Sequence, residues 1–124
     1  MNLTNLYTIL EKERSEDAIV TVKVQLNKNH QLFEGHFPGH HVLPGVVTLQ
    51  IIKELTETEC NATLFMYSAS NIKFLSIVDP ALNAMLIFNL QLQKENDTIK
   101  VKNSTTFTDG TIVMKSTTVY STKH

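Results

Sequence analysis

Several residue types are scarce in this sequence, and each scarcity excludes a class of protein. Cys60 is the single cysteine, so no internal disulfide can form. Residues 1–10 lack the basic segment and long apolar run of a signal peptide, and a reducing cytoplasm is therefore the expected compartment. With only 4 glycines and 3 prolines, the composition excludes a collagen-like, linker-dominated or disordered chain.

The sequence also has neither a large net charge nor a long apolar run. The 11 basic and 12 acidic side chains leave a net charge of -1, so no overall positive field would hold nucleic acid or an anionic membrane. The longest run poor in charge, 35–52, contains three histidines and falls short of the roughly 18 apolar residues that a membrane span needs. We therefore expect no nucleic-acid partner and no membrane span.

What is present favours one folded domain. The chain has 124 residues, of which 42% are hydrophobic, and this length predicts a single domain over 1–124. Within 18–26, Val20, Val22, Val24 and Leu26 alternate with polar residues, which is the pattern of a half-buried strand. The apolar segment 6–10 predicts an earlier strand or a short helix, and the polar stretch 11–17 predicts the turn between the two segments.

The second half of the sequence has the pattern of an antiparallel meander. Alternation over 86–92 resumes at Ile99 and Val101 after the polar turn 94–97. Asp109-Gly110 predicts a further turn, followed by a strand rich in β-branched residues over 112–120. A long strand is also expected over 64–78, ended by Asp79-Pro80, because proline lacks the N–H that a strand ladder needs.

One segment departs from the β pattern. Directly after Pro44-Gly45, apolar residues surround only a few polar positions over about three turns, 46–55, which predicts a largely buried helix. Two strands, one buried helix and a long meander indicate an α+β domain in which an antiparallel sheet covers the helix.

The segment before this helix carries a long motif. Residues 33–47 read FEGHFPGHHVLPGVV, and the predicted helix runs straight out of the motif. The motif closely resembles the signature of the β-hydroxyacyl-acyl-carrier-protein dehydratases. This resemblance implies the hot-dog fold, in which the sheet wraps one central helix, two protomers join their sheets edge to edge, and two active sites lie at the dimer interface.

The resemblance assigns chemistry to two residues of the motif. Dehydration of a 3-hydroxyacyl thioester needs a base for the α-proton, an acid for the leaving hydroxyl and a donor to the developing enolate oxygen. His36 matches the family's catalytic histidine, whose near-neutral pKa lets it take and return a proton. Gly45 matches the glycine whose N–H, at the helix start, polarises the thioester carbonyl.

The third chemical element is missing. The family has an acidic residue on the central helix fourteen positions after the histidine, contributed across the interface, and here that position is Gln50. An amide can orient a water or hydroxyl but cannot donate a proton near pH 7. Glu54, one turn further on, is a distant substitute. A second departure is His41, where the family usually has proline, so the loop has one fewer fixed φ.

We expect a hydro-lyase that dehydrates 3-hydroxyacyl chains carried on the phosphopantetheine of acyl-carrier protein, in fatty-acid or polyketide-like biosynthesis. One alternative is a weakly active or inactive subunit that binds acyl chains or pairs with an active dehydratase. The other is a hot-dog acyl thioesterase. The expected partners are acyl-carrier protein, the acyl thioester and a second hot-dog protomer, identical or different.

The remaining candidate groups favour structural interpretations. No metal or redox cofactor is implied, since no acidic or cysteine cluster accompanies His36, His40 and His41. Four lysines, Lys53, Lys73, Lys100 and Lys102, are expected at the solvated surface. Only a position near the mouth of the acyl tunnel would make one of them a carrier-protein contact.

Overall fold

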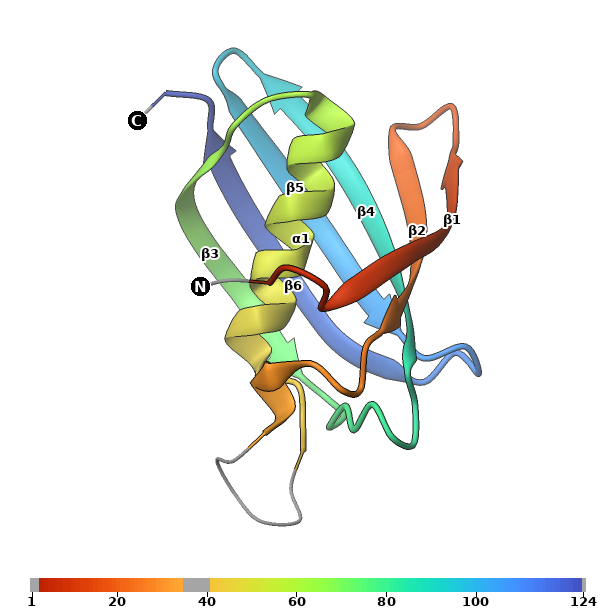
Figure 1. The fold of residues 1–124 in the computed structure, drawn as a ribbon. Coiled ribbons are helices and arrows are strands. Elements are labelled where there is room, and N and C mark those ends of the chain that lie inside the picture. Colours follow the sequence, from red (N-terminus) through yellow and green to blue (C-terminus); the bar gives the residue numbers. More distant parts are fainter. Residues whose placement is uncertain (1–2, 35–40, 124) are drawn as a thin grey trace.

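A helix lies against the concave face of a curved antiparallel sheet (Figure 1). The structure, a computed structural model, describes residues 3–34 and 41–123. Within them the elements follow in the order β1 (Tyr7–Arg14), β2 (Ile19–Leu26), η1 (Gln31–Phe33), α1 (Gly45–Cys60), β3 (Phe65–Phe74), β4 (Met85–Glu95), β5 (Thr98–Thr106) and β6 (Ile112–Ser121). The six-stranded sheet has the order β1-β2-β4-β5-β6-β3, so β1 and β3 form its edges.

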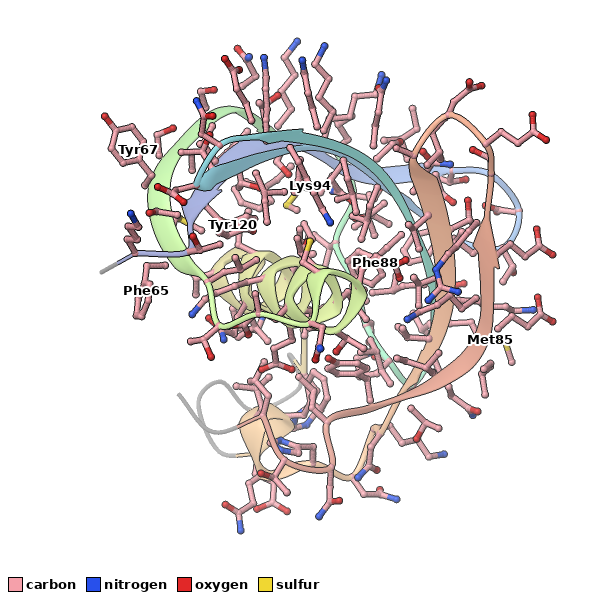
Figure 2. The ribbon with its side chains drawn as sticks, turned by 90° about the horizontal axis from the view of Figure 1, so that it is seen from above. Phe65, Tyr67, Met85, Phe88, Lys94 and Tyr120 are labelled. Atoms are coloured by element: carbon pink, nitrogen blue, oxygen red, sulfur yellow. The ribbon has the colours of Figure 1, made fainter. Side chains whose placement is uncertain are left out.

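The inner face of the sheet is built by strict alternation along the central strands. In β2 the buried residues are Val20, Val22, Val24 and Leu26, and in β4 they are Leu86, Phe88 and Leu90. Val22 is the register partner of Phe88, and Val24 is that of Leu86, so the buried rows of the two strands coincide. Figure 2 shows Phe88 and Tyr120 directed from the sheet toward α1. The α+β architecture predicted from the sequence is confirmed.

Helix α1 supplies the other side of the core. Val47, Ile51, Ile52 and Leu55 are at most 2% exposed and face the sheet, while Thr56 donates its buried hydroxyl to the Ile52 carbonyl, 2.7 Å away. The helix ends at Asn61, which is in the left-handed conformation with φ 51 and returns its N–H to the carbonyls of Glu57 and Thr58. Asparagine tolerates this conformation better than most residues, so it terminates the helix at little cost.

Three boundaries differ from the sequence prediction. The expected turn over 11–17 is too long, because β1 continues to Arg14 and only the following residues turn, with Ala18 at φ 58. The helix runs to Cys60 rather than ending near Leu55. The strand expected over 64–78 ends at Phe74. For β1 and α1 the local polarity was misleading, since it marks exposed strand and exposed helix ends as it marks loops. The end of β3 has no local polar signal, because the residues after Phe74 are largely apolar.

Polar contacts at two points along α1 join the β1–β2 hairpin to the helix. The Tyr7 hydroxyl donates to Glu54 Oε1 at 2.8 Å. At the far end of the helix, Glu59 forms ion pairs with Arg14 and with Lys12, whose ammonium lies 3.4 Å from Glu59 Oε2. The neighbouring Arg14 guanidinium lowers the pKa of the Glu59 carboxyl. The hairpin is therefore held to the helix at two points.

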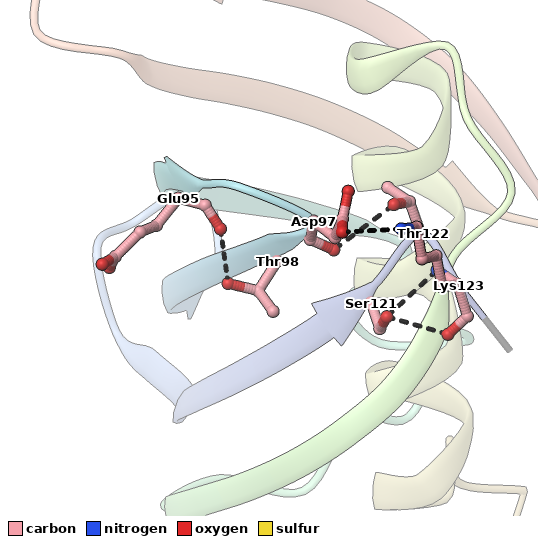
Figure 3. Close-up of polar contacts among 6 residues, drawn as sticks. All are labelled: Glu95, Asp97, Thr98, Ser121, Thr122 and Lys123. Atoms are coloured by element: carbon pink, nitrogen blue, oxygen red, sulfur yellow. Dashed lines mark hydrogen bonds and ion pairs between the residues drawn. The ribbon is translucent and has the colours of Figure 1, made fainter.

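The turn between β4 and β5 is held by the end of β6 (Figure 3). Thr122 donates its N–H to the Asp97 carbonyl at 2.9 Å, and the Lys123 ammonium lies 3.1 Å from Asp97 Oδ2. Within the turn, the Thr98 hydroxyl donates to the Glu95 carbonyl at 2.9 Å. The Asp97 carboxylate is thus paired at this corner of the sheet.

Strand β3 is the exposed edge. Among the described residues it pairs with β6 alone, and its ten residues are exposed or half-buried throughout. Large apolar side chains on and near it face solvent, among them Tyr67 at 77% and Ile77 at 76% exposure. An unpaired strand edge flanked by apolar side chains is a template for association with another chain.

We predict that Tyr7→Phe lowers the free energy of unfolding by about 0.5–1.5 kcal/mol near neutral pH, the usual net value of one hydrogen bond. Burial, followed by the bond to Glu54, raises the pKa of Tyr7. Its contribution is complete below the unfolded pKa of about 10 and declines as the pH rises above it, because the unfolded phenol then ionises more readily.

Urea titrations from neutral to alkaline pH test this prediction. The difference between wild type and Tyr7→Phe should shrink above about pH 10. Tyr67→Phe is the matched control, because this tyrosine is 77% exposed and should show neither effect. Identical stabilities for wild type and Tyr7→Phe across the whole range would contradict the prediction.

Candidate functional site

The motif leads from η1 into α1, and its two ends are well anchored. His36 and His40 lie outside the described residues, so the role predicted for His36 stays a prediction. Before the gap, Phe33 is 5% exposed, and after it Leu43 is 7% exposed. The Leu43 N–H donates to the Val78 carbonyl at 2.8 Å, which ties the approach to the helix to the segment following β3.

His41 connects the two ends of this loop. Its Nδ1 bonds the backbone oxygen of Phe33, eight residues earlier. Because a carbonyl only accepts, Nδ1 carries the proton. Proline at this position would fix φ but could not make the bond. The histidine therefore replaces a local backbone restraint with a longer-range one, a consequence that the sequence alone did not reveal.

Gly45 begins α1 at a terminus without a side-chain cap. The preceding residue, Pro44, has no side-chain acceptor, and its carbonyl receives the N–H groups of Val47 and Thr48 at 3.0 and 3.2 Å. Within the described residues no group accepts the N–H of Gly45 or Val46. Such amides at a helix start carry partial positive charge and remain available to an oxyanion or carbonyl.

The Phe74 side chain crowds this glycine. A Cβ on Gly45 would lie 2.5 Å from Cζ and 3.1 Å from Cδ1 of Phe74, so the ring packs directly against the helix start. The ring is 59% exposed and comes from the end of β3, far away in the sequence. The sequence placed Lys73-Phe74 on a strand, but no local pattern indicates the contact with Gly45. Phe74 is the site residue that sequence reasoning missed.

Gln50 lies on α1 beyond Gly45 and is half-buried. No group in the described part of the chain forms a hydrogen bond with its side chain. Its helix neighbour Ile51 points into the core, whereas Val46, one turn earlier, is 63% exposed. Gln50 thus lies between the core and the surface, and its amide has no hydrogen-bond partner among residues 3–34 and 41–123.

Two other side chains that could take part in chemistry, those of Glu54 and Cys60, are not available for it. Glu54 accepts the Tyr7 hydroxyl on the side of β1, so it is committed to joining the hairpin to the helix. Cys60 is at the opposite end of α1 from Gly45, and burial raises the pKa of its thiol. A thiol of raised pKa is a poor nucleophile near neutral pH.

Comparisons with known proteins identify the family and the fold of this chain. A family model described as ApeI dehydratase, of the ApeI-like family, matches residues 11–114. The chain belongs to this dehydratase family. The predicted family relationship is confirmed, with most of the sheet and all of α1 inside the matched region.

Relatives of known name include two 3-hydroxyacyl-acyl-carrier-protein dehydratases, both called FabZ. That of Streptococcus pneumoniae serotype 4 (strain TIGR4) is 30% identical over 115 residues, covering 87% of this chain and 80% of the relative. That of Streptococcus suis (strain 98HAH33) is 30% identical over 129 residues, covering 95% and 90%. This family member is therefore similar to FabZ over nearly its whole length.

Solved structures confirm the hot-dog fold. The dehydratase heterocomplex ApeI:P from Xenorhabdus doucetiae superposes with a TM-score of 0.74 at 15% identity, covering 92% of this chain and 96% of that chain. A hypothetical thioesterase with coenzyme A from Streptococcus pneumoniae TIGR4 gives a TM-score of 0.67 at 17% identity, covering 97% and 89%. At such identities the likeness concerns the fold alone.

No helix in the described residues has the length and apolar content needed to cross a membrane.

We predict that His41→Ala loosens the segment leading into α1. Losing the bond to Phe33 should speed hydrogen exchange at the Leu43 amide by roughly 2- to 10-fold, which corresponds to about 0.5–1.5 kcal/mol for one net hydrogen bond. Amide exchange followed by NMR measures the effect. Val42→Ala, an exposed neighbour, is the control. Unchanged exchange in a folded His41→Ala protein would show that the contact does not restrain the loop.

Proposed function

We propose that this dehydratase-family protein converts 3-hydroxyacyl thioesters on acyl-carrier protein into trans-2-enoyl thioesters. The observation that carries the proposal is the uncapped start of α1 at Gly45, directly after the signature loop, with the Phe74 ring packed against it. A thioester oxygen accepting the Gly45 N–H would gain negative charge as the α-carbon loses its proton, and this amide would stabilise that charge.

The steps require one residue to act twice. His36 takes the α-proton, the electron pair forms the new double bond as the C–O bond of the hydroxyl breaks, and the departing oxygen recovers the proton from His36 as water. Gln50 holds the hydroxyl or its water by hydrogen bonds, since its amide has no proton to give. Without a separate general acid, the reaction should be slower by roughly 10²- to 10⁴-fold.

Gln50→Glu tests this proposal most directly. The substitution supplies an acid at nearly unchanged size, and turnover of hydroxyacyl thioesters should rise about 10-fold or more. The gain should be in kcat rather than KM, because protonation of the leaving oxygen strengthens a transition-state interaction. The pH profile should acquire a second limb. A folded variant with no gain on several chain lengths would count against a catalytic role for this position.

His36→Ala should abolish hydration and dehydration while leaving the circular dichroism spectrum intact. Enoyl-thioester hydration, followed by loss of absorbance, provides the assay. Activity retained within a few-fold would remove His36 from the mechanism. Release of free thiol by the wild type, detected with a thiol reagent, would instead favour the thioesterase alternative.

The proposed site is completed by a second protomer joined at β3. The edge of this strand is unpaired, and the exposed apolar side chains near it and near the start of α1 include Val42, Val46, Met66, Tyr67, Phe74, Leu75 and Ile77. Pairing there would cover an apolar surface and place the partner beside Gly45. In this arrangement Gln50 of one protomer would contribute to the site of the other.

We predict that Tyr67→Glu shifts a dimer toward the 14.0 kDa monomer in light scattering, because it introduces a charge beside the β3 edge. Met85→Glu is the control, since Figure 2 shows Met85 and Tyr67 on opposite sides of the molecule. Equal dimer populations for both variants would place the interface elsewhere.

A second candidate is a subunit that pairs with an active dehydratase. The missing carboxylate at Gln50 favours it, and the structural neighbour ApeI:P is itself a dehydratase heterocomplex. In such a pair the partner would donate the acid to the site containing His36. A wild-type protein that is monomeric and inactive alone, but gains both dimer and activity with a second hot-dog protein, would establish this candidate over the first.

A further inference from the structure

Three lysines surround a hollow on the outer face of the sheet, away from α1. The hollow has a volume of about 280 Å³ and is lined by Asn71, Lys73, Lys102, Asn103, Lys115, Ser116 and Thr117. All three lysines are exposed, and they come from β3, β5 and β6. Three positive side chains therefore gather where three neighbouring strands meet.

The strand register brings these like charges together. Lys73 of β3 is the direct cross-strand partner of Lys115 in β6. Lys102 of β5 is opposite Thr117, two residues from Lys115 on the same face of β6. Like charges directly opposite each other in a sheet are destabilising. The arrangement therefore costs stability unless an anion lies between the ammonium groups.

No acidic side chain in the described residues offsets this charge. The ion pairs found there join Lys12 and Arg14 to Glu59, and Lys123 to Asp97 (Figure 3). Strands β3, β5 and β6 contain no Asp or Glu. The hollow is therefore a region of concentrated positive charge on a chain whose net charge is -1.

A backbone irregularity coincides with the hollow. The β3–β6 register shifts between Ser70 and Lys73, and Asn71 in this bulge has φ 52. Bulges redirect side chains and locally interrupt the ladder. Here the bulge lies beside Lys73, so the interrupted ladder and the three cations occur at one place.

We propose that this hollow binds a phosphate group. Phosphate carries up to two negative charges and several acceptor oxygens, and lysine ammonium groups bind it as mobile point charges with three donors each. The polar side chains of Asn71 and Thr117 border the same space and can hydrogen-bond oxygens that the lysines leave free. The hollow is lined by three lysines and by Asn, Ser and Thr residues, with no large apolar side chain, so it fits a compact anion better than an acyl chain.

Two sources could supply this phosphate. One is free inorganic phosphate, which would act as a soluble effector. The other is the phosphate of a phosphopantetheine arm, and this second source rests on the proposed function. Lys73 directly precedes Phe74, the residue packed against Gly45, so the hollow and the candidate site lie on either side of the same strand end.

Titration with inorganic phosphate, followed by ¹⁵N NMR, tests the site. The amides of Lys73, Lys102 and Lys115 should shift saturably, and sodium chloride at equal ionic strength should not reproduce the shifts. Lys115→Gln should weaken binding by about 2- to 5-fold, the range for one exposed charge pair, and the triple Lys-to-Gln variant should lose saturable binding.

Lys100→Gln is the matched control, because Lys100 is exposed on the same face of β5 but does not line the hollow. Equal weakening by Lys100→Gln and Lys115→Gln would show a diffuse field and overturn the proposal, as would the absence of saturable shifts in the wild type. These measurements involve no turnover, so they stand or fall separately from the proposed dehydration.

Pantetheine and 4′-phosphopantetheine distinguish the sources. Tighter binding of 4′-phosphopantetheine than of inorganic phosphate, with no response to pantetheine, identifies the carrier arm as the source. Equal binding of the two phosphates identifies a site for free phosphate. If pantetheine shifts the three lysine amides as strongly as 4′-phosphopantetheine, the phosphate is not what is recognised and the proposal fails.

Discussion

The structure depends on the burial of one helix face against the inner side of a curved sheet. Val47, Ile51, Ile52 and Leu55 meet the inward rows of the central strands, and each fully buried side chain of this size contributes about 1.5–3 kcal/mol. This packing fixes the direction of α1 and hence the position of its first residue. The packing of the core therefore determines the position of Gly45. The same packing sets the position of the backbone amide that would take part in the chemistry.

Most of the fold could be predicted from the sequence because the buried residues of its strands and helix recur periodically. Alternation in β2, β4 and β5 and the uninterrupted apolar pattern of α1 each have a physical period that survives without knowledge of partners. Boundaries were less readable where both faces are polar. Residues 11–14 of β1 look like a turn by composition, yet they pair with β2, because a cross-strand register is set by the neighbouring strand and not by the segment itself.

Residues of the candidate site could be predicted from the sequence only where they lie close together along the chain. The signature loop identified the family, and the resemblance to that family singled out Gly45 and Gln50 as candidate site residues. Phe74 and His41 illustrate what spacing does not contain. The ring that crowds the glycine at the helix start comes from β3, and the bond from His41 to Phe33 depends on how two ends of a loop approach each other. Packing likewise determines that Glu54 accepts the Tyr7 hydroxyl and that the Gln50 amide has no hydrogen-bond partner among the described residues.

The distribution of lysines over the sheet gives the molecule an electric dipole moment. Strands β3, β5 and β6 carry four lysines and no carboxylate, while the chain as a whole is slightly negative, so the centres of positive and negative charge are separated. An approaching anion would exert a torque on the protein, turning the outer sheet face toward itself before contact. Because the Debye length is about 8 Å at physiological ionic strength, this orientation operates only over the last layer or two of water and vanishes first when salt is added.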